Sequence, residues 1–345
     1  MEGVRRDKVA VVAGVTGGRH TMMWGALVAL QKALEKDYDV VAYFGFSGGS
    51  IAAALMSSEI HKEPGGTEAW LRKSSPYGKY GKIGGCKLPC NLWNLFRHGG
   101  LLNSETLYKK VFKKMFSGMD LKTPVYMGTW SPSSNKEVLL DAQKICPGKG
   151  IASSAALPFA ISSFKISNQE LLGLGYGDIM KGISSDPDGY SFFADGGISS
   201  ALGVGIIDDA EAVQKEELET GFPVPVIGIN IDPITYDHSS DFKSYPWYKK
   251  IWEACWGTVR SNVHDDIREA ESERALFLSV LPTEADLMKF ATKFDASFDE
   301  NMMLYRAGYK QCEEWLSSSY GGYDTPIDAI KAKFKELHES VDKKK

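Results

Sequence analysis

The sequence predicts an α/β protein with a mainly parallel central sheet and a helical C-terminal part. Two apolar runs near the N-terminus are each followed by a segment in which apolar residues recur at helical spacing. This alternation is typical of a unit of strand, helix and strand, whose two strands pair in parallel. A further apolar run lies near residue 225, and the pattern from residue 245 onward is mostly helical.

The expected elements follow in order along the first two thirds of the chain. The first four are a strand at 8–13, a helix at 21–35, a strand at 39–46 and a helix at 50–56. The segment SETLYKKVFKKMF then predicts an amphipathic helix with Ser104 as its N-cap. Later strands are expected at 125–127, 137–140 and 223–231.

We predict two regions that meet near residue 235. Residues 1–235 carry the alternating strands and helices and form the main domain, and residues 236–345 form a helical region that packs on it or extends it. Residues 75–100 are rich in glycine and lysine and have no clear period. They are therefore expected to form an insertion or a lid.

The composition argues against several classes of protein. The formal net charge of -4 does not fit a general nucleic-acid binder, which is normally basic over a whole domain. The N-terminal apolar run is too short for a secretory signal, and no later run approaches the roughly 18 residues of a membrane-spanning helix. The expected location is therefore the cytoplasm. Five cysteines at irregular spacing predict reduced thiols, and Cys86 and Cys90 lack the second pair of ligands that a metal site needs, so we expect no metal and no cofactor.

A serine stands at the corner between the second predicted strand and the helix after it. The residues GFSGG, at 45–49, match the GxSxG pattern of a nucleophile elbow, in which a sharp turn presents the serine hydroxyl above the sheet. Gly45 and Gly49 leave room for the strand and the helix at this turn. The N-terminus of the following helix favours the negative charge that develops in acyl transfer. Ser47 is therefore the predicted nucleophile.

A nucleophilic serine needs a base, and the sequence offers a carboxylate. None of the six histidines stands in an obvious strand-end loop with turn residues around it. Asp195, in contrast, follows the run YSFFA and precedes two glycines, so it is expected at a strand end on a tight turn. Since Asp-Gly turns are common, a Ser-His-Asp esterase remains the alternative among enzymes.

Together, these motifs resemble the patatin-like phospholipase family. Ser47 stands in GFSGGS and Asp195 in ADGG, as in the Ser-Asp dyad of that family, which works without a histidine. Three further segments are similar to family signatures in the same order: VTGGRH at 15–20, GLLNSETL at 100–107 and ASSAALPFAISSF at 152–164, which contains Pro158. The resemblance implies a three-layer α/β/α fold, with residues 1–235 as the catalytic domain.

The resemblance also implies an oxyanion hole in the loop after the first strand. In the family, backbone amides of a glycine-rich loop hold the oxyanion, and the matching donors here are Gly17 and Gly18, with Thr16 as a further candidate. Arg19 either supports this loop or contacts a lipid phosphate. The sequence departs from the family pattern at Val15, Thr16 and His20.

The activity that the resemblance implies is lipid acyl hydrolysis of the phospholipase A or lysophospholipase type. Ser47 would attack an ester of a membrane phospholipid, with Asp195 as the base, and form an acyl-enzyme. Two other functions remain open. One is the Ser-His-Asp esterase, acting on another lipid or a small ester, and the other is a binding or scaffold protein with the patatin fold but without catalysis.

The expected partner is a phospholipid membrane surface, on which the protein binds peripherally. Residues 58–122 contain 12 Lys or Arg against 5 Asp or Glu, an excess that fits either an anionic membrane or a solvated surface. Aromatic residues of the segment YPWYKKIWEACWGTV share one helical face, which suits either the core or the membrane interface. No nucleic acid is expected as a partner, and the sequence predicts neither an activating protein nor an oligomeric state. These features are also compatible with an effector delivered into another cell.

Overall fold

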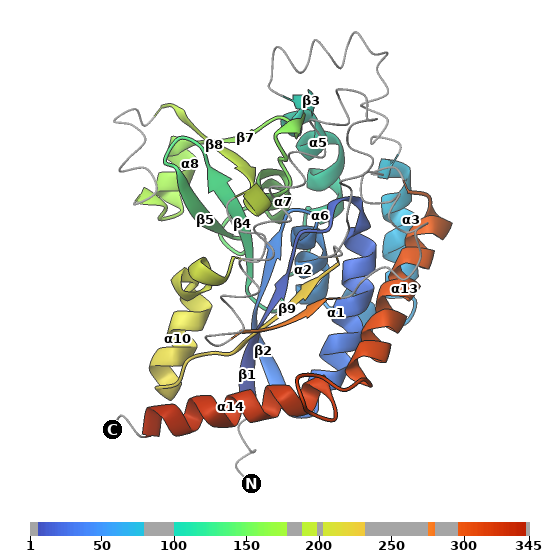
Figure 1. The fold of residues 1–345 in the computed structure, drawn as a ribbon. Coiled ribbons are helices and arrows are strands. Elements are labelled where there is room, and N and C mark those ends of the chain that lie inside the picture. The colour runs from blue at the N-terminus through green and yellow to red at the C-terminus, as the bar shows by residue number, and fades with distance from the viewer. Residues whose placement is uncertain are drawn as a thin grey trace, which may run out of the picture.

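The centre of the fold is a sheet of eight strands (Figure 1). In the computed structural model, the residues described are 6–78, 100–177, 188–198, 203–231, 275–279 and 296–342. Within these residues the strand order is β10-β9-β1-β2-β4-β8-β7, and β5 also pairs with β4. The strands are β1 (Asp7–Ala13), β2 (Tyr38–Phe46), β4 (Val125–Ser131), β5 (Lys136–Asp141), β7 (Phe164–Ser167), β8 (Tyr190–Asp195), β9 (Val226–Asn230) and β10 (Ala275–Ser279). Two short strands, β3 (Gly100–Leu102) and β6 (Phe159–Ile161), form a separate parallel pair.

Helices fill most of the connections between these strands. The described α-helices are α1 (His20–Leu34), α2 (Gly49–Ser57), α3 (Gly66–Gly78), α5 (Ser104–Leu107), α6 (Lys113–Phe116), α7 (Pro147–Ser154), α8 (Asn168–Gly173), α10 (Glu211–Thr220), α13 (Phe298–Leu316) and α14 (Pro326–Asp342). A π-helical turn (Tyr108–Phe112) joins α5 to α6. Short 3-10 turns occur at Gly17–Arg19, Ile60–Lys62, Gly196–Ile198 and Val204–Asp209. Across the described ranges, no helix has both the length and the apolar character needed to cross a bilayer.

The sheet is parallel on one side and antiparallel on the other. From β10 through β9, β1 and β2 to β4, each pair of neighbours is parallel. β5, β8 and β7 then add antiparallel pairs. The predicted α/β class with a mainly parallel central sheet is confirmed, and the antiparallel extension is a feature that the alternation of strand and helix did not predict.

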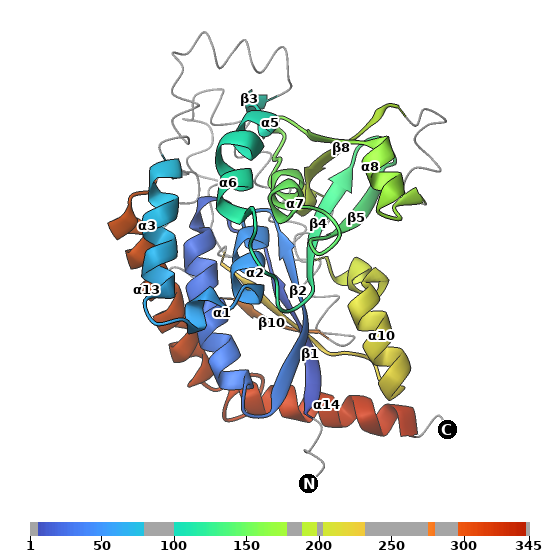
Figure 2. The ribbon, with the colours of Figure 1, turned by 180° about the vertical axis from the view of Figure 1, so that it is seen from behind.

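Helices cover both faces of the sheet, which gives three layers (Figures 1 and 2). Along β1, Val9 and Val11 belong to one apolar cluster, and Ala10 and Val12 belong to another, as expected for a strand buried on both faces. The first cluster includes residues of α1, α2 and α13, and the second includes residues of α10. The C-terminal residues are part of this body, because β10 extends the sheet and α13 lies along α1.

The helices α1 and α13 approach each other at a pair of glycines. A Cβ atom at Gly25 would lie 2.0 Å from the Tyr305 carbonyl oxygen, and one at Gly308 would lie 1.9 Å from a carbonyl oxygen of α1. Beside this contact Trp24 is fully buried, and the rings of Trp70 and Tyr305 stand edge-on to it at 5.6 and 5.2 Å. Backbone therefore packs directly on backbone, which no residue with a side chain permits at these two positions.

The first four predicted elements each begin and end within one residue of an observed element. The prediction of Ser104 as an N-cap is wrong by one position. Asn103 caps α5, with its Oδ1 accepting a hydrogen bond from the Thr106 amide at 2.9 Å. Ser104 is instead buried, and its hydroxyl donates to the Ser163 carbonyl oxygen at 3.0 Å. In the C-terminal region, the helical prediction missed strand β10.

Candidate active site

Ser47 occupies the sharp turn between β2 and α2. Its φ angle is 54°, in the left-handed region that a residue with a side chain rarely adopts. Glycines on both sides make the turn sterically feasible. A Cβ atom at Gly45 would lie 2.4 Å from the Ser50 Cα. One at Gly49 would lie 2.3 Å from the Ala13 carbonyl oxygen, so the arrangement of strand, turn and helix expected for GxSxG is present.

One edge of β4 brings the ends of β2 and β8 together, while β5 occupies its other edge. Phe46 of β2 pairs with Gly128, and Asp195 of β8 pairs with the next residue, Thr129. Because β2 runs parallel to β4 and β8 runs antiparallel to it, the carboxyl ends of both strands meet at this point. The register of three strands therefore places Ser47 beside Asp195, although 148 residues separate them in the sequence.

The side chains of Ser47 and Asp195 form a short hydrogen bond. Ser47 Oγ donates to Asp195 Oδ2 at 2.6 Å, and Asp195 Oδ1 accepts from the Gly197 amide at 2.9 Å. Ser47 is 6% exposed and Asp195 is 1% exposed. Burial raises the pKa of Asp195 to about 6, against the opposing effect of the hydrogen bonds from Ser47 and Gly197. At neutral pH the carboxylate is therefore ionised and more basic than an exposed aspartate, which suits a general base.

No described histidine forms a hydrogen bond with either residue of this pair. His61 interacts with Gln31 through Nε2 at 3.0 Å, and His338 lies against Phe222 with ring centroids 4.4 Å apart. His20 begins α1 just after the loop that follows β1, and burial lowers its pKa to about 4, which keeps it neutral at physiological pH. The remaining three, His98, His238 and His264, lie outside the described residues.

The loop predicted to hold the oxyanion lies against the turn of Ser47. A Cβ atom at Gly48 would lie 2.3 Å from the Gly17 carbonyl oxygen and 2.4 Å from Thr16 Oγ1. Gly17 has a φ of 57° and begins the 3-10 turn of this loop. In the described part of the chain, the amides of Gly17, Gly18 and Gly48 donate no hydrogen bond. All three are therefore candidates to donate to a bound group.

Arg19 has no exposed surface and supports this loop from within. Its Nε donates to the Thr16 carbonyl oxygen at 3.4 Å, and its backbone amide donates to the same oxygen at 3.2 Å. Thr16 Oγ1 in turn donates to the Gly17 carbonyl oxygen at 3.3 Å. Of the two roles predicted for Arg19, the geometry favours support of the loop over contact with a lipid phosphate.

Ser154 contacts the backbone of Ser47, although the sequence analysis assigned it no role. It ends α7, and its Oγ accepts a hydrogen bond from the Ser47 amide at 2.9 Å. The same hydroxyl donates to the Gly128 carbonyl oxygen at 2.6 Å. Two residues further on, the Ala156 carbonyl oxygen accepts from the Asp195 amide at 3.0 Å. The sequence does contain a run of small residues here, ASSAALP at 152–158, but nothing in this run indicates a contact with Ser47.

Several predicted features lie outside the described residues. They are residues 79–99, which include Cys86 and Cys90 and most of the predicted insertion or lid, and the aromatic segment at 245–259. Within the described part of 58–122, four exposed lysines form a lysine face on the helical segment from α5 to α6: Lys109, Lys110, Lys113 and Lys114. Among described residues, no group of three or more His, Cys, Asp or Glu could hold a metal ion.

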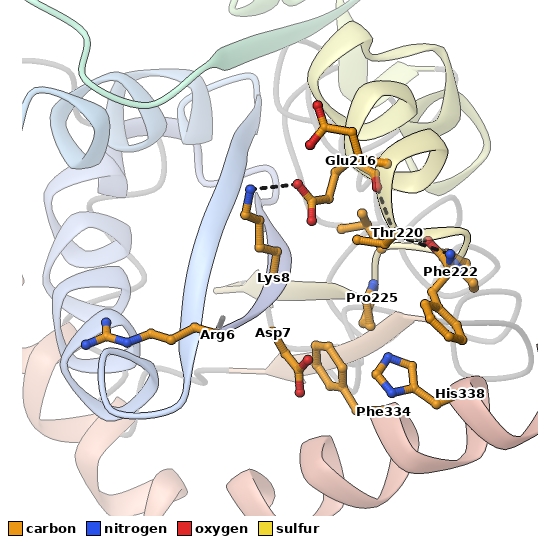
Figure 3. Close-up of a pocket in the computed structure, with 12 residues that line it drawn as sticks. Arg6, Asp7, Lys8, Glu216, Thr220, Phe222, Pro225, Phe334 and His338 are labelled. Atoms are coloured by element: carbon orange, nitrogen blue, oxygen red, sulfur yellow. Dashed lines mark hydrogen bonds and ion pairs between the residues drawn. The ribbon is translucent and has the colours of Figure 1, made fainter. Parts of the chain in front are cut away.

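A separate cavity lies at the amino end of β1, between α10 and α14 (Figure 3). Its volume is about 370 Å³, and its lining includes Lys8, Phe222 and His338. Lys8 Nζ forms an ion pair with Glu216 at 2.6 Å within it. Ser47 follows the carboxyl end of β2 and Asp195 is the last residue of β8, so this cavity at the amino end of β1 is not part of the candidate active site.

Comparisons with known proteins give distant structural similarities, and two of them are described below. No family model matches the chain, and no curated protein sequence does. The chain is similar to VipD from Legionella pneumophila, with a TM-score of 0.33 and 11% identity, over 87% of this chain and 67% of that chain. It is also similar to the type III effector protein ExoU, with a TM-score of 0.30 and 11% identity, over 89% of this chain and 52% of that chain. Both TM-scores are well below 0.5.

Proposed function

We propose that this protein is a lipid acyl hydrolase of the patatin-like type, which cleaves ester-linked fatty acids from membrane phospholipids. The observation that carries the proposal is the 2.6 Å hydrogen bond from Ser47 Oγ to Asp195 Oδ2. The serine stands at a corner of strand, turn and helix, and the carboxylate beside it is buried. A serine on such a corner with a basic carboxylate as its partner is the arrangement that nucleophilic acyl transfer needs.

In the proposed reaction, Asp195 is the general base. Its Oδ2 accepts the hydroxyl proton while Ser47 Oγ bonds to the ester carbonyl carbon, and the carbonyl oxygen becomes an oxyanion. When the tetrahedral intermediate collapses, the bond to the leaving alcohol breaks and that oxygen takes the proton from Asp195. Water then attacks the acyl-enzyme and gives a proton to Asp195. Release of the fatty acid returns that proton to Ser47.

The oxyanion would be held by backbone amides on two sides of Ser47. Gly17 and Gly18 belong to the loop after β1, and Gly48 belongs to the turn itself, so two different segments that lie against each other would supply the amides. The amide of Thr16 is a further candidate donor. The N-terminus of α2 adds a favourable field for the same negative charge.

Phospholipid is proposed as the substrate class on the basis of the family resemblance and the lysine face. The motifs around Ser47 and Asp195 occur in the order found in patatin-like phospholipases. The lysine face carries four exposed positive charges on one helical segment of an otherwise acidic chain. We therefore propose that the protein acts as a peripheral enzyme on an anionic membrane surface.

A fluorophosphonate probe and phospholipid vesicles test this proposal. The purified full chain is expected to be labelled at Ser47 and to release fatty acid from vesicles, and Ser47→Ala is expected to lose both activities, by about a thousandfold or more for hydrolysis. Labelled peptides and released fatty acids are both measured by mass spectrometry. A wild-type protein that is not labelled would instead be a binding or scaffold protein. Labelling at Ser47 with release only from short soluble esters would contradict the phospholipid substrate.

A further inference from the structure

The hydrogen bonding between β2 and β4 changes where Ser47 leaves the sheet. Earlier in the ladder, the Tyr43 amide donates directly to the Pro124 carbonyl oxygen at 2.9 Å. The same register would place the Ser47 amide opposite the Gly128 carbonyl oxygen. Ser154 Oγ stands between these two groups instead, accepting from the first at 2.9 Å and donating to the second at 2.6 Å. The hydroxyl of Ser154 thus replaces one backbone hydrogen bond between the two segments.

The chemistry of the three groups fixes the direction of both hydrogen bonds. The Ser47 amide can only donate and the Gly128 carbonyl can only accept, so the single hydroxyl proton of Ser154 must point to Gly128. Ser154 has no exposed surface. Without this hydroxyl, the buried Ser47 amide would lose its acceptor, or would move to the Gly128 carbonyl oxygen and bond to it directly.

We propose that Ser154 is a positioning residue for the nucleophile, a role that rests on the proposed function of Ser47. The hydroxyl lies between the Ser47 amide and the Gly128 carbonyl oxygen, so these two groups cannot form a direct hydrogen bond and the pairing of β2 with β4 ends here. Ser47 is thereby held in its left-handed conformation with Oγ directed to Asp195. If the ladder closed, the backbone of Ser47 would move toward Gly128, and the hydrogen bond to Asp195 would lengthen.

The segment that carries Ser154 also anchors the base. The Ala156 carbonyl oxygen accepts from the Asp195 amide at 3.0 Å. Two residues of this short segment therefore bind the backbone amides of the pair, Ser154 through its side chain and Ala156 through its carbonyl oxygen. This segment sets the spacing between nucleophile and base from one point in the fold.

The test compares two neighbouring serines of α7. Ser153 is also fully buried, but its hydroxyl donates to the Lys149 carbonyl oxygen of the same helix at 3.0 Å. Ser154→Ala is expected to lower both kcat on phospholipid vesicles and the rate constant of fluorophosphonate labelling by about 10- to 100-fold, with KM changed by no more than about twofold. Ser153→Ala removes the same atom from the same helix and is expected to stay within about twofold of wild type.

A second pair of variants separates positioning from general damage to the fold. Ser154→Thr retains the hydroxyl, whereas Ser154→Cys fills the site with a sulfur that donates and accepts weakly. The threonine variant is expected to be labelled faster than the cysteine variant, and this comparison decides the matter if Ser154→Ala does not fold. Equal losses in Ser153→Ala and Ser154→Ala, or equal rates for the threonine and cysteine variants, would overturn the positioning role. A wild-type protein that is not labelled at Ser47 would overturn the proposed function, and this role with it.

Discussion

At the scale of single residues, the ionisation of Asp195 sets the pH range in which Ser47 can react. Burial raises the pKa of this carboxyl group to about 6, even though Ser47 and Gly197 both donate hydrogen bonds to it. The neutral acid cannot accept the proton of Ser47, so only the ionised fraction is competent. Above this pKa the carboxylate is ionised and a stronger base than an exposed aspartate.

The rate constant for fluorophosphonate labelling of Ser47 is expected to fall about tenfold for each pH unit below about 6 and to level off above it. The sign follows from the chemistry, because protonation of Asp195 removes the base. Asp195→Asn keeps the shape of the side chain, and it is expected to lower hydrolysis by about a thousandfold or more. Labelling rates of the wild type and of Asp195→Asn, measured across the pH range, check the profile, and release of fatty acid checks the loss of hydrolysis.

His20→Ala provides the matched control for the pH profile. Burial lowers the pKa of His20 to about 4, so this histidine is neutral on both sides of the expected inflection. The variant is expected to keep the inflection near pH 6. An inflection that vanished in a histidine variant and persisted in Asp195→Asn would replace the dyad with a triad.

At the scale of elements, the sequence predicted where β2 and β8 end, but it did not predict that these two strand ends lie side by side. Ser47 and Asp195 were identified because each lies between an apolar run and glycines, which is a local pattern. Their contact depends on the pairing of β4, which is with β2 up to Gly128 and with β8 from Thr129 onward. No local sequence pattern predicts this register. Ser154 was missed for the same reason, since its partners come from the turn after β2 and from β4.

The C-terminal elements show a second limit of sequence reasoning. The strand β10 is the five-residue run ALFLS, and a short apolar run can be either a strand or part of a helix. Its pairing with β9 decides between these alternatives, and that pairing joins segments far apart in the chain. The helix α13 agrees with the mostly helical pattern expected after residue 245, and it begins with a capping box at Ser297 and Glu300.

The contact between α1 and α13 gives a prediction at this scale. Gly25→Ala would place a methyl group 2.0 Å from the Tyr305 carbonyl oxygen, so the two helices must separate. We expect the free energy of unfolding to fall by at least about 2 kcal/mol, measured by urea denaturation. Gly173→Ala is the control, because a Cβ atom at this helical position meets nothing within 4 Å. Equal stability of the two variants would contradict the close packing of α1 and α13.

At the scale of the whole molecule, the site and the C-terminal helix lie at opposite ends of the sheet. Ser47 follows the carboxyl end of β2, whereas α14 contacts its amino end, where the rings of Tyr38 and Phe334 lie 4.8 Å apart. The helical segment from α5 to α6, which carries the lysine face, lies away from α14, toward the other end of the molecule (Figure 1). A membrane that docks on the lysine face would therefore approach the end of the molecule that carries the site.

Hydrolysis of anionic vesicles is expected to exceed that of neutral vesicles and to fall as salt is added, because salt screens exposed charges over about 8 to 10 Å at physiological ionic strength. Each lysine near an anionic surface contributes about 1 kcal/mol, so Lys113→Gln with Lys114→Gln is expected to weaken vesicle binding by about 10- to 30-fold. Vesicle sedimentation at several salt concentrations measures the binding.

The double variant Lys331→Gln with Lys335→Gln is the control for docking. It removes two exposed positive charges from α14, at the opposite end of the molecule, and changes the net charge by the same amount. We expect its vesicle binding to stay close to that of the wild type. Equal weakening in both double variants would show that total charge, and not the lysine face, attracts the membrane.

The close packing of α13 on α1 has a consequence for folding during translation. The helix α13 leaves the ribosome more than two hundred residues after α1, which at the roughly 5–20 residues per second of translation is a delay of tens of seconds. Strands β1 to β8, which carry Ser47 and Asp195, are complete well before that. The nascent chain is thus expected to bring Ser47 and Asp195 together while the side of α1 that carries Gly25 is not yet covered by α13.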